Sequence, residues 1–134
     1  MSIKNPYIES MRYIDNARLQ LHQAGEEDKF YVDEKYVKSA CGIAYSGILK
    51  GLDFLFEIKG VPKKKGRKSI EYYQSHLASL DRKLLNYFNN AYRVLHLNGY
   101  YEGETKINTI ETGFDSALSI IDSLKPYSDK TFKI

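Results

Sequence analysis

The sequence predicts an all-α protein, an up-and-down four-helix bundle with long second and third helices. Apolar residues recur at helical spacing in four segments, and capping residues, glycine and proline separate these segments. No segment shows the apolar and polar alternation of a strand. The 134 residues suit a single domain, 1–134, that is large enough to bury a hydrophobic core.

The first helix is expected over residues 6–24. Asn5 is a suitable N-cap, and Pro6 suits the first helical position, where a missing N–H costs nothing. Gly25 follows the last apolar residue of the segment and is expected to end the helix. The acidic residues 26–28 then read as a solvated connection.

The second helix is expected over residues 33–59, from Asp33 as N-cap to a stop at Gly60 and Pro62. A row of small residues lies beside its apolar stripe: Ala40, Ala44, Gly47 and Gly51. A glycine inside a helix costs about 1 kcal/mol relative to alanine, so a compensating interaction is required. Close approach of another helix is the expected compensation, and a ligand-sized gap is the alternative.

Residues 59–68 are expected to form a basic hairpin between the second and third helices. Five of its positive side chains are candidates for nucleic-acid binding: Lys63, Lys64, Lys65, Arg67 and Lys68. Each could contact a phosphate and give salt-sensitive, sequence-independent binding. The alternatives are a solvated turn, or contact with an acidic protein surface such as the last helix of another copy.

The third helix is expected over residues 69–98, with Ser69 as N-cap and Asn98-Gly99 as C-cap. Apolar residues repeat along it every seven positions and predict a seam for antiparallel neighbours: Tyr73, Leu80, Tyr87 and Val94. The last helix is expected over residues 104–125, with Pro126 ending it.

Composition excludes several classes of protein. The chain is 43% hydrophobic and 28% charged, as in ordinary globular proteins, and its net charge of +3 does not by itself indicate nucleic acid. The single Cys41 excludes an internal disulfide, and no apolar run is long enough for a signal peptide or a membrane span. We therefore expect a cytoplasmic protein that does not enter the membrane.

No cofactor or metal is expected. The sequence contains no glycine-rich phosphate loop and no His-Glu-x-x-His zinc motif. Its three histidines lie on different predicted segments: His22, His76 and His96. Twelve tyrosines are more simply explained as core residues with a polar edge than as stacking platforms for bases.

The stretch 89–103 gathers the groups most capable of anion binding or proton transfer, with Arg93 and His96 beside Tyr92 and Tyr100. At about 100° per residue, Arg93 and His96 share a polar face that points away from the core seam. In a monomer this face is simply solvated, and the helix dipole favours both cations there. If a second copy covers the face, paired arginines and histidines could bind phosphate and exchange protons.

Residues 44–53, Ala-Tyr-Ser-Gly-Ile-Leu-Lys-Gly-Leu-Asp, are followed by a basic connection and a long helix that ends in arginine and histidine. This layout over about residues 5–125 resembles HEPN-type helical bundles, and it is similar to the four-helix proteins encoded in ribosomal RNA intervening sequences. The resemblance implies a homodimer. In active HEPN proteins it implies a metal-independent RNase that uses an arginine followed by histidine after four to six residues.

The sequence departs from that motif. Only two residues separate Arg93 from His96, and Val94 stands where the family has a polar residue. We therefore expect a non-catalytic, dimeric interaction module that binds a protein partner or RNA. The alternative is a HEPN-type endoribonuclease with Arg93 and His96 at the dimer interface and Tyr92 or Tyr100 assisting. A bundle that serves only assembly is the third interpretation.

Overall fold

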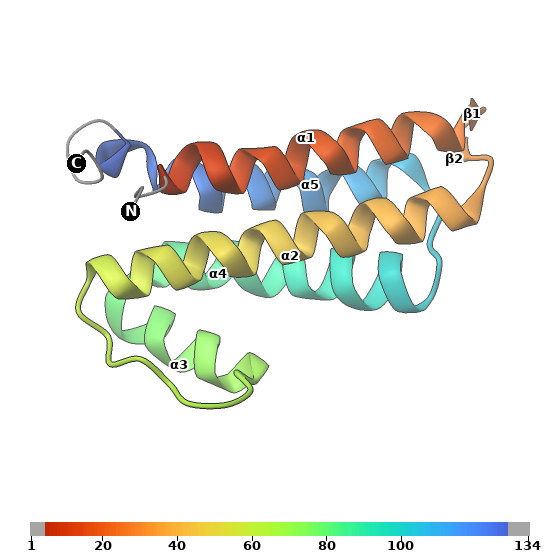
Figure 1. Cartoon of the computed structure of the whole chain (residues 1–134). Helices are drawn as coiled ribbons and strands as arrows, with labels where there is room; N and C mark the ends of the chain where they lie inside the picture. The colour runs from red at the N-terminus through yellow and green to blue at the C-terminus, as the bar shows by residue number, and fades with distance from the viewer. Residues whose placement is uncertain (1–4, 129–134) are drawn as a thin grey trace.

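The computed structural model describes residues 5–128 and is predominantly helical, which confirms the all-α class (Figure 1). Its elements are α1 (Pro6–Ala24), β1 (Glu26–Glu27), β2 (Phe30–Tyr31), α2 (Glu34–Ile58), α3 (Ile70–Leu80), α4 (Arg82–Ala91), the π-helix η1 (Tyr92–Tyr101), α5 (Ile107–Asp122) and the 3-10 helix η2 (Lys125–Tyr127). The helix α1 packs against α2, while α4 and η1 pack against α5, and η1 also packs against α2. The predicted count of four helices was wrong, because the third segment is divided.

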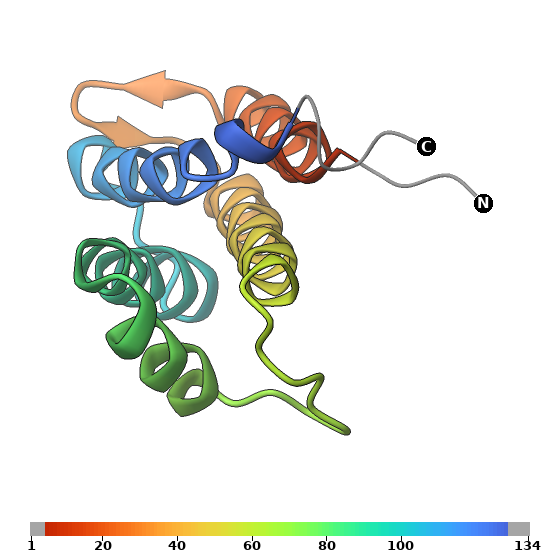
Figure 2. The ribbon, with the colours of Figure 1, turned by 90° about the vertical axis from the view of Figure 1, so that its left-hand side faces the viewer.

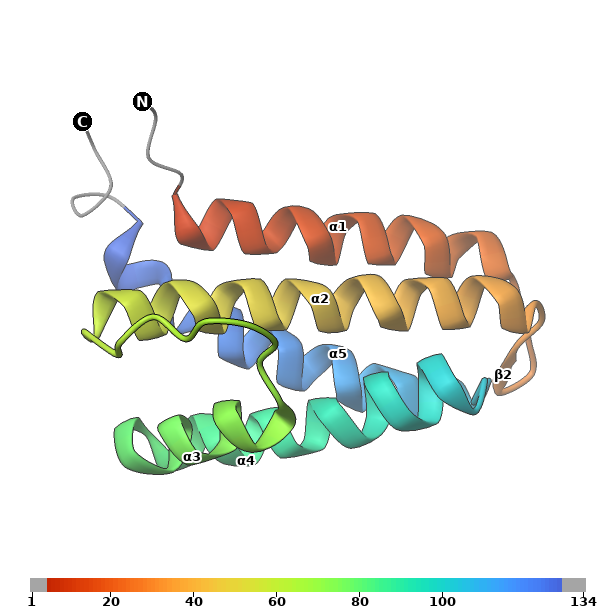
Figure 3. The same ribbon diagram turned by 60° about the horizontal axis from the view of Figure 1, so that its bottom comes forward.

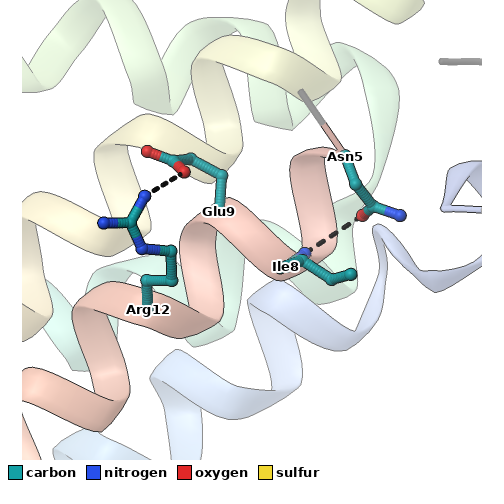
Figure 4. Close-up of polar contacts among 4 residues, drawn as sticks. All are labelled: Asn5, Ile8, Glu9 and Arg12. Carbon is teal, nitrogen blue, oxygen red and sulfur yellow. Dashed lines mark hydrogen bonds and ion pairs between the residues drawn. The ribbon is translucent and has the colours of Figure 1, made fainter. Parts of the chain in front are cut away.

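The first helix begins and ends as predicted. The side-chain oxygen of Asn5 accepts a hydrogen bond from the backbone N–H of Ile8 at 3.0 Å (Figure 4), and Pro6 occupies the first helical position. One turn later, Arg12 forms an ion pair with Glu9 at 3.0 Å. Gly25 ends the helix with a φ of 71°, in the left-handed region that glycine adopts without strain.

The small residues of α2 serve close helix packing, as predicted. A Cβ atom added to Gly47 would lie 2.5 Å from the Cβ atom of Tyr13 in α1. A Cβ atom added to Gly51 would lie 3.1 Å from the hydroxyl oxygen of Ser10. Van der Waals attraction between α1 and α2 at this short separation offsets the low helix propensity of the two glycines.

The predicted third helix, residues 69–98, is broken at Asp81. The backbone of Asp81 is extended, and its carboxylate accepts hydrogen bonds from the N–H groups of Lys83 and Leu84 at 3.0 and 3.2 Å. Such a side chain starts a new helix instead of continuing the previous one. The seven-residue repeat therefore does not form one seam, and Leu80 remains 39% exposed.

The chain reverses at this break, so that α3 folds back along α4 (Figure 2). The amide of Gln74 donates to the side-chain oxygen of Asn89 at 2.9 Å. The ring of Tyr73 lies 5.9 Å from the ring of Phe88. Because of the reversal, the N-terminus of α3 approaches the end of α4, where η1 begins.

The predicted C-cap at Asn98-Gly99 was also wrong. The helical backbone continues as η1 to Tyr101, and the positive φ that ends it belongs to Gly103, at 73°. Gly99 is needed for packing, since a Cβ atom there would lie 2.8 Å from the Cβ atom of the buried Cys41. This glycine brings η1 close to α2.

The acidic connection after α1 is an antiparallel hairpin, in which Glu27 pairs with Phe30. The hairpin also fixes the connection before α5. Tyr31 donates its N–H to the carbonyl of Thr105 at 2.8 Å, and Ile107 donates to the carbonyl of Lys29 at 3.0 Å. The last helix therefore begins at Ile107 instead of 104, and Pro126 lies within the separate turn η2.

A polar cluster joins the hairpin, α1 and α5. The guanidinium of Arg18 donates to the carboxylate of Glu111 at 2.7 Å, and the hydroxyl of Tyr31 donates to the same oxygen at 3.0 Å. Desolvation opposes the charge of Glu111, but the hydrogen bond and positive charge of Arg18 outweigh it and lower the pKa of the carboxyl.

Within the described residues, no helix has the length and apolar character to cross a bilayer.

Candidate functional site

His96 lies at the centre of a cluster of tyrosine rings. Its imidazole stacks on Tyr45 of α2 and on Tyr92, with ring centroids 4.7 and 5.4 Å away. It is nearly parallel to the ring of Tyr100 at 6.1 Å and meets the edge of Tyr101 at 4.9 Å. Desolvation in this setting lowers the pKa of His96. The predicted polar face therefore does not include His96, which instead faces α2.

Arg93 is exposed on a different side of η1. Its guanidinium donates to the side-chain oxygen of Asn90 at 2.8 Å, and the amide of Asn90 donates to the hydroxyl of Ser116 in α5 at 2.8 Å. A π-helix turns through a smaller angle per residue than an α-helix, which separates side chains that an α-helical projection places together. The structure does not bring Arg93 and His96 together.

The basic segment 59–68 is an extended connection without strand pairing, not a hairpin. Its direction changes at Gly60 and Gly66, whose φ angles are 80° and 84°. The segment runs along α2 before it turns to α3 (Figure 3). Its exposed cations are Lys59, Lys63, Lys64, Lys65 and Arg67, while Lys68 is partly buried. Lys68 forms an ion pair with Asp53 of α2 at 3.1 Å.

Three adjoining hollows follow α2 from the basic segment to a groove between α1, α2 and η1. The lysine hollow is lined by Lys50, Phe56, Lys63, Lys64, Lys68 and Tyr72, among others. The middle hollow includes Tyr45, Arg67, Lys68, Tyr73, Tyr92 and His96. The α2 groove includes Tyr13, Gly42, Tyr45, Leu49, His96 and Tyr100. Shared residues join the three: Lys68 lines the first two, and the Tyr45–His96 ring pair lines the last two.

The Asp53 carboxylate organises the boundary between the lysine hollow and the middle hollow. One of its oxygens accepts a hydrogen bond from the hydroxyl of Tyr73 at 3.0 Å and also contacts the ammonium of Lys68. Burial, followed by the charge of Asp53, raises the pKa of Tyr73, which stays a neutral donor. The carboxylate thereby holds Lys68 at the edge of the middle hollow.

Gly42 shapes the other end of these hollows. A Cβ atom added at this position would lie 3.0 Å from the ring of Tyr100, so glycine lets that ring approach α2. Tyr100 follows His96 by four residues, as His96 follows Tyr92, and the three rings form one column on η1. This column is the aromatic wall of the site.

The arrangement provides cations for an anion and aromatic faces for a planar group. The described residues provide little for other chemistry. Burial raises the pKa of Cys41 to about 12, so its thiol is protonated near neutral pH and is not a nucleophile. Among residues 5–128, no group of three or more His, Cys, Asp or Glu side chains could hold a metal ion.

The structure thus unites two sets of predicted residues that are far apart in sequence. Arg67 and Lys68 of the basic segment line the same hollow as Tyr92 and His96. Sequence reasoning missed Tyr45, Asp53 and Tyr73 as members of the site. A signal for Tyr45 was present, since it lies three residues after Gly42, on the flank of α2 beside the buried small residues.

A family model described as a domain of unknown function (DUF5618) matches residues 5–125. The chain belongs to the DUF5618 family. A solved structure similar to this DUF5618 member is a protein of unknown function from Dyadobacter fermentans, with 41% sequence identity and a TM-score of 0.85. The match covers 95% of this chain and 99% of the other. No curated protein matches the chain. These findings are consistent with the helical fold and give no HEPN assignment.

Proposed function

We propose that this DUF5618 protein is a non-catalytic, homodimeric interaction module that binds single-stranded RNA. One observation carries the proposal: a basic segment and a column of stacked aromatic rings line adjoining hollows on one side of α2. Proteins that bind single strands combine positive charge for the phosphates with aromatic faces for the bases. Stacking tolerates any base, so the expected binding has little sequence preference.

The arrangement of charge supports an extended strand as the ligand. The exposed ammonium groups of Lys63 and Lys64 line the lysine hollow, and Arg67 lines the middle hollow beside Tyr92 and His96. A strand following this path would meet cations first and rings next. The α2 groove continues beyond the rings without a charged side chain in its lining.

Fluorescence anisotropy with a labelled, short single-stranded RNA tests the proposal. Affinity is expected to fall steeply with salt, with the logarithmic slope changing by about 0.7 for each phosphate contact. The K63A/K64A/K65A variant is expected to weaken binding about tenfold and to reduce the slope. Equal binding by this variant and the wild type would show that the basic segment does not contact the RNA.

The chain offers a control with the same change in net charge. Lys29, Lys35 and Lys106 are exposed and lie around the hairpin, at the other end of α2 from the basic segment. The K29A/K35A/K106A variant should bind RNA nearly as well as the wild type. Equal weakening by both triple variants would indicate attraction to net charge instead of a site.

The same assay separates the alternatives. Shortening of the RNA in the presence of EDTA, abolished by His96→Ala, would indicate the endoribonuclease that uses Arg93 and His96. Binding of polyglutamate but not RNA would indicate an acidic protein partner. The HEPN-like layout supports the homodimer, and light scattering tests it: a monomer at micromolar concentration would overturn that part of the proposal.

A further inference from the structure

We propose that the middle hollow is a pocket for one nucleotide, with its phosphate against Arg67 and Lys68 and its base against the rings of Tyr92 and His96. The inference rests on the proposed function and deepens it. It places one nucleotide of the bound RNA in the middle hollow. It also predicts that a free nucleoside monophosphate binds there without the rest of a strand.

The size and lining of the middle hollow fit such a ligand. Its volume is about 530 Å³, within the usual range for pockets that hold small molecules. Two cations, Arg67 and Lys68, and several aromatic rings line the hollow together. A nucleotide carries the two matching groups, an anionic phosphate and a flat base.

The neighbouring hollows differ from the middle hollow in charge or in their aromatic rings, since the rings of the lysine hollow (Phe54, Phe56 and Tyr72) lie outside the aromatic column. The α2 groove shares the Tyr45–His96 ring pair, but no charged side chain lines it. The lysine hollow has several cations, but the carboxylates of Asp53 and Glu57 also line it and oppose an anion. Only the middle hollow, among the three, joins cations to the aromatic column.

The carboxylate of Asp53 competes with the proposed phosphate for the ammonium group of Lys68. In the structure, the Lys68 ammonium is paired with an Asp53 oxygen at 3.1 Å, and this pair is partly exposed. A phosphate that binds Lys68 must share the ammonium with Asp53 or displace the carboxylate. Affinity is therefore expected to rise when Asp53 loses its charge.

The substitution Asp53→Asn tests this competition without removing the acceptor of the Tyr73 hydrogen bond, because the amide oxygen can still accept it. Glu57→Gln is the matched control. Like Asp53, Glu57 lines the lysine hollow and carries a negative charge, and it lies one turn further along α2, whereas the Lys68 ammonium is paired with Asp53. An effect of net charge would appear in both variants, whereas competition for Lys68 would appear only in D53N.

Isothermal titration of the full chain with adenosine 5′-monophosphate, adenosine and inorganic phosphate is the decisive experiment. The monophosphate is expected to bind at least about fivefold more tightly than either fragment, since it uses both parts of the hollow. D53N should tighten its binding about threefold and E57Q should leave it unchanged, while Arg67→Ala should weaken it about fivefold. Tyr92→Leu should also weaken it, whereas Phe30→Leu, at an exposed aromatic position on the hairpin and outside the hollow, should not.

The outcomes distinguish this inference from the proposed function. If the RNA strand binds but the monophosphate does not, the nucleotide pocket is overturned and RNA binding stands. If neither binds, both are overturned. If adenosine binds as tightly as its monophosphate, the phosphate makes no contact that adds to affinity. If D53N and E57Q tighten binding equally, Asp53 does not compete with the phosphate for Lys68. Thermal unfolding of each variant shows that lost binding is not lost folding.

Discussion

The imidazole of His96 lies against the phenol ring of Tyr45, with the ring centroids 4.7 Å apart and the planes inclined by 27°. This stacked pair joins η1 to α2 and separates the middle hollow from the α2 groove. The pair contributes to packing between two helices, and in the proposed RNA-binding site it also presents aromatic surface to a base.

Partial burial of His96 predicts a pH dependence of stability. Its pKa in the folded protein lies below 6.5, so the unfolded chain binds the proton more readily. The free energy of unfolding should therefore fall as the pH is lowered through 6.5 toward the folded-state value. Thermal unfolding of wild type and His96→Gln should show a stability difference that shifts against the wild type between pH 8 and pH 5. The exposed His22 provides the control variant, H22Q. A difference that is constant with pH for H96Q would contradict the prediction.

The Glu111 carboxylate should contribute to stability at neutral pH. Glu111→Gln weakens the hydrogen bonds from Arg18 and Tyr31 and is expected to reduce the free energy of unfolding by about 1 kcal/mol, since the pair is partly exposed. The pKa of Glu111 is lowered from 4.5, so this contribution is present above pH 4.5 and is lost as the pH falls through the folded-state value. Urea unfolding at pH 7 and pH 3 measures both effects. An equal loss in Glu102→Gln, at an exposed position, would point to net charge instead of the cluster.

Contact between Gly99 and Cys41 predicts a paired effect of two substitutions. Gly99→Ala places a methyl group against the Cys41 side chain and is expected to destabilise the fold by about 2 kcal/mol. Cys41→Ala removes the sulfur atom, so the double variant should be less destabilised than the sum of the two single variants. A double-mutant cycle measured by urea unfolding gives this coupling directly. Additive effects would show that the contact does not limit the approach of η1.

The hydrogen bonds at Asp81 predict that its capping oxygen, and not its charge, contributes to stability. Asp81→Ala removes the acceptor for two backbone N–H groups and should cost about 1 kcal/mol. Asp81→Asn retains a capping oxygen and should cost much less. Circular dichroism during thermal unfolding of both variants measures the difference. Equal losses would show that the charge, and not the cap, sets the break between α3 and α4.

The starts of three helices were predicted correctly because hydrogen bonds between residues close in sequence determine them. Asn5, Asp33 and Ser69 cap helices as expected, because each side chain bonds to backbone a few residues away. Asp81 has the same chemistry, but it lies inside a regular apolar repeat, and that repeat predicts an unbroken helix. In the structure, the local cap prevails over the repeat.

The site was predictable only in fragments. The sequence singled out the basic segment and the group around His96, but their meeting depends on the reversal at Asp81, which carries the start of α3 toward η1. The separation of Arg93 from His96 depends on the π-helix, which the spacing of apolar residues did not indicate. In both cases one unbroken α-helix with about 100° per residue was assumed. In the structure, the chain reverses at Asp81 and winds as a π-helix from Tyr92.

The π-helix has a consequence for how the segment tolerates changes in chain length. Tyr92–Tyr101 takes up more residues for each turn than an α-helix would, and the rings of Tyr92, His96 and Tyr100 face α2 because of that winding. A segment one residue shorter, wound as an α-helix, could still join α4 to Gly103. Its side chains would be rotated about the helix axis, and different groups would line the hollows. An insertion or deletion between 92 and 101 would therefore alter the proposed nucleotide binding while the bundle itself persists.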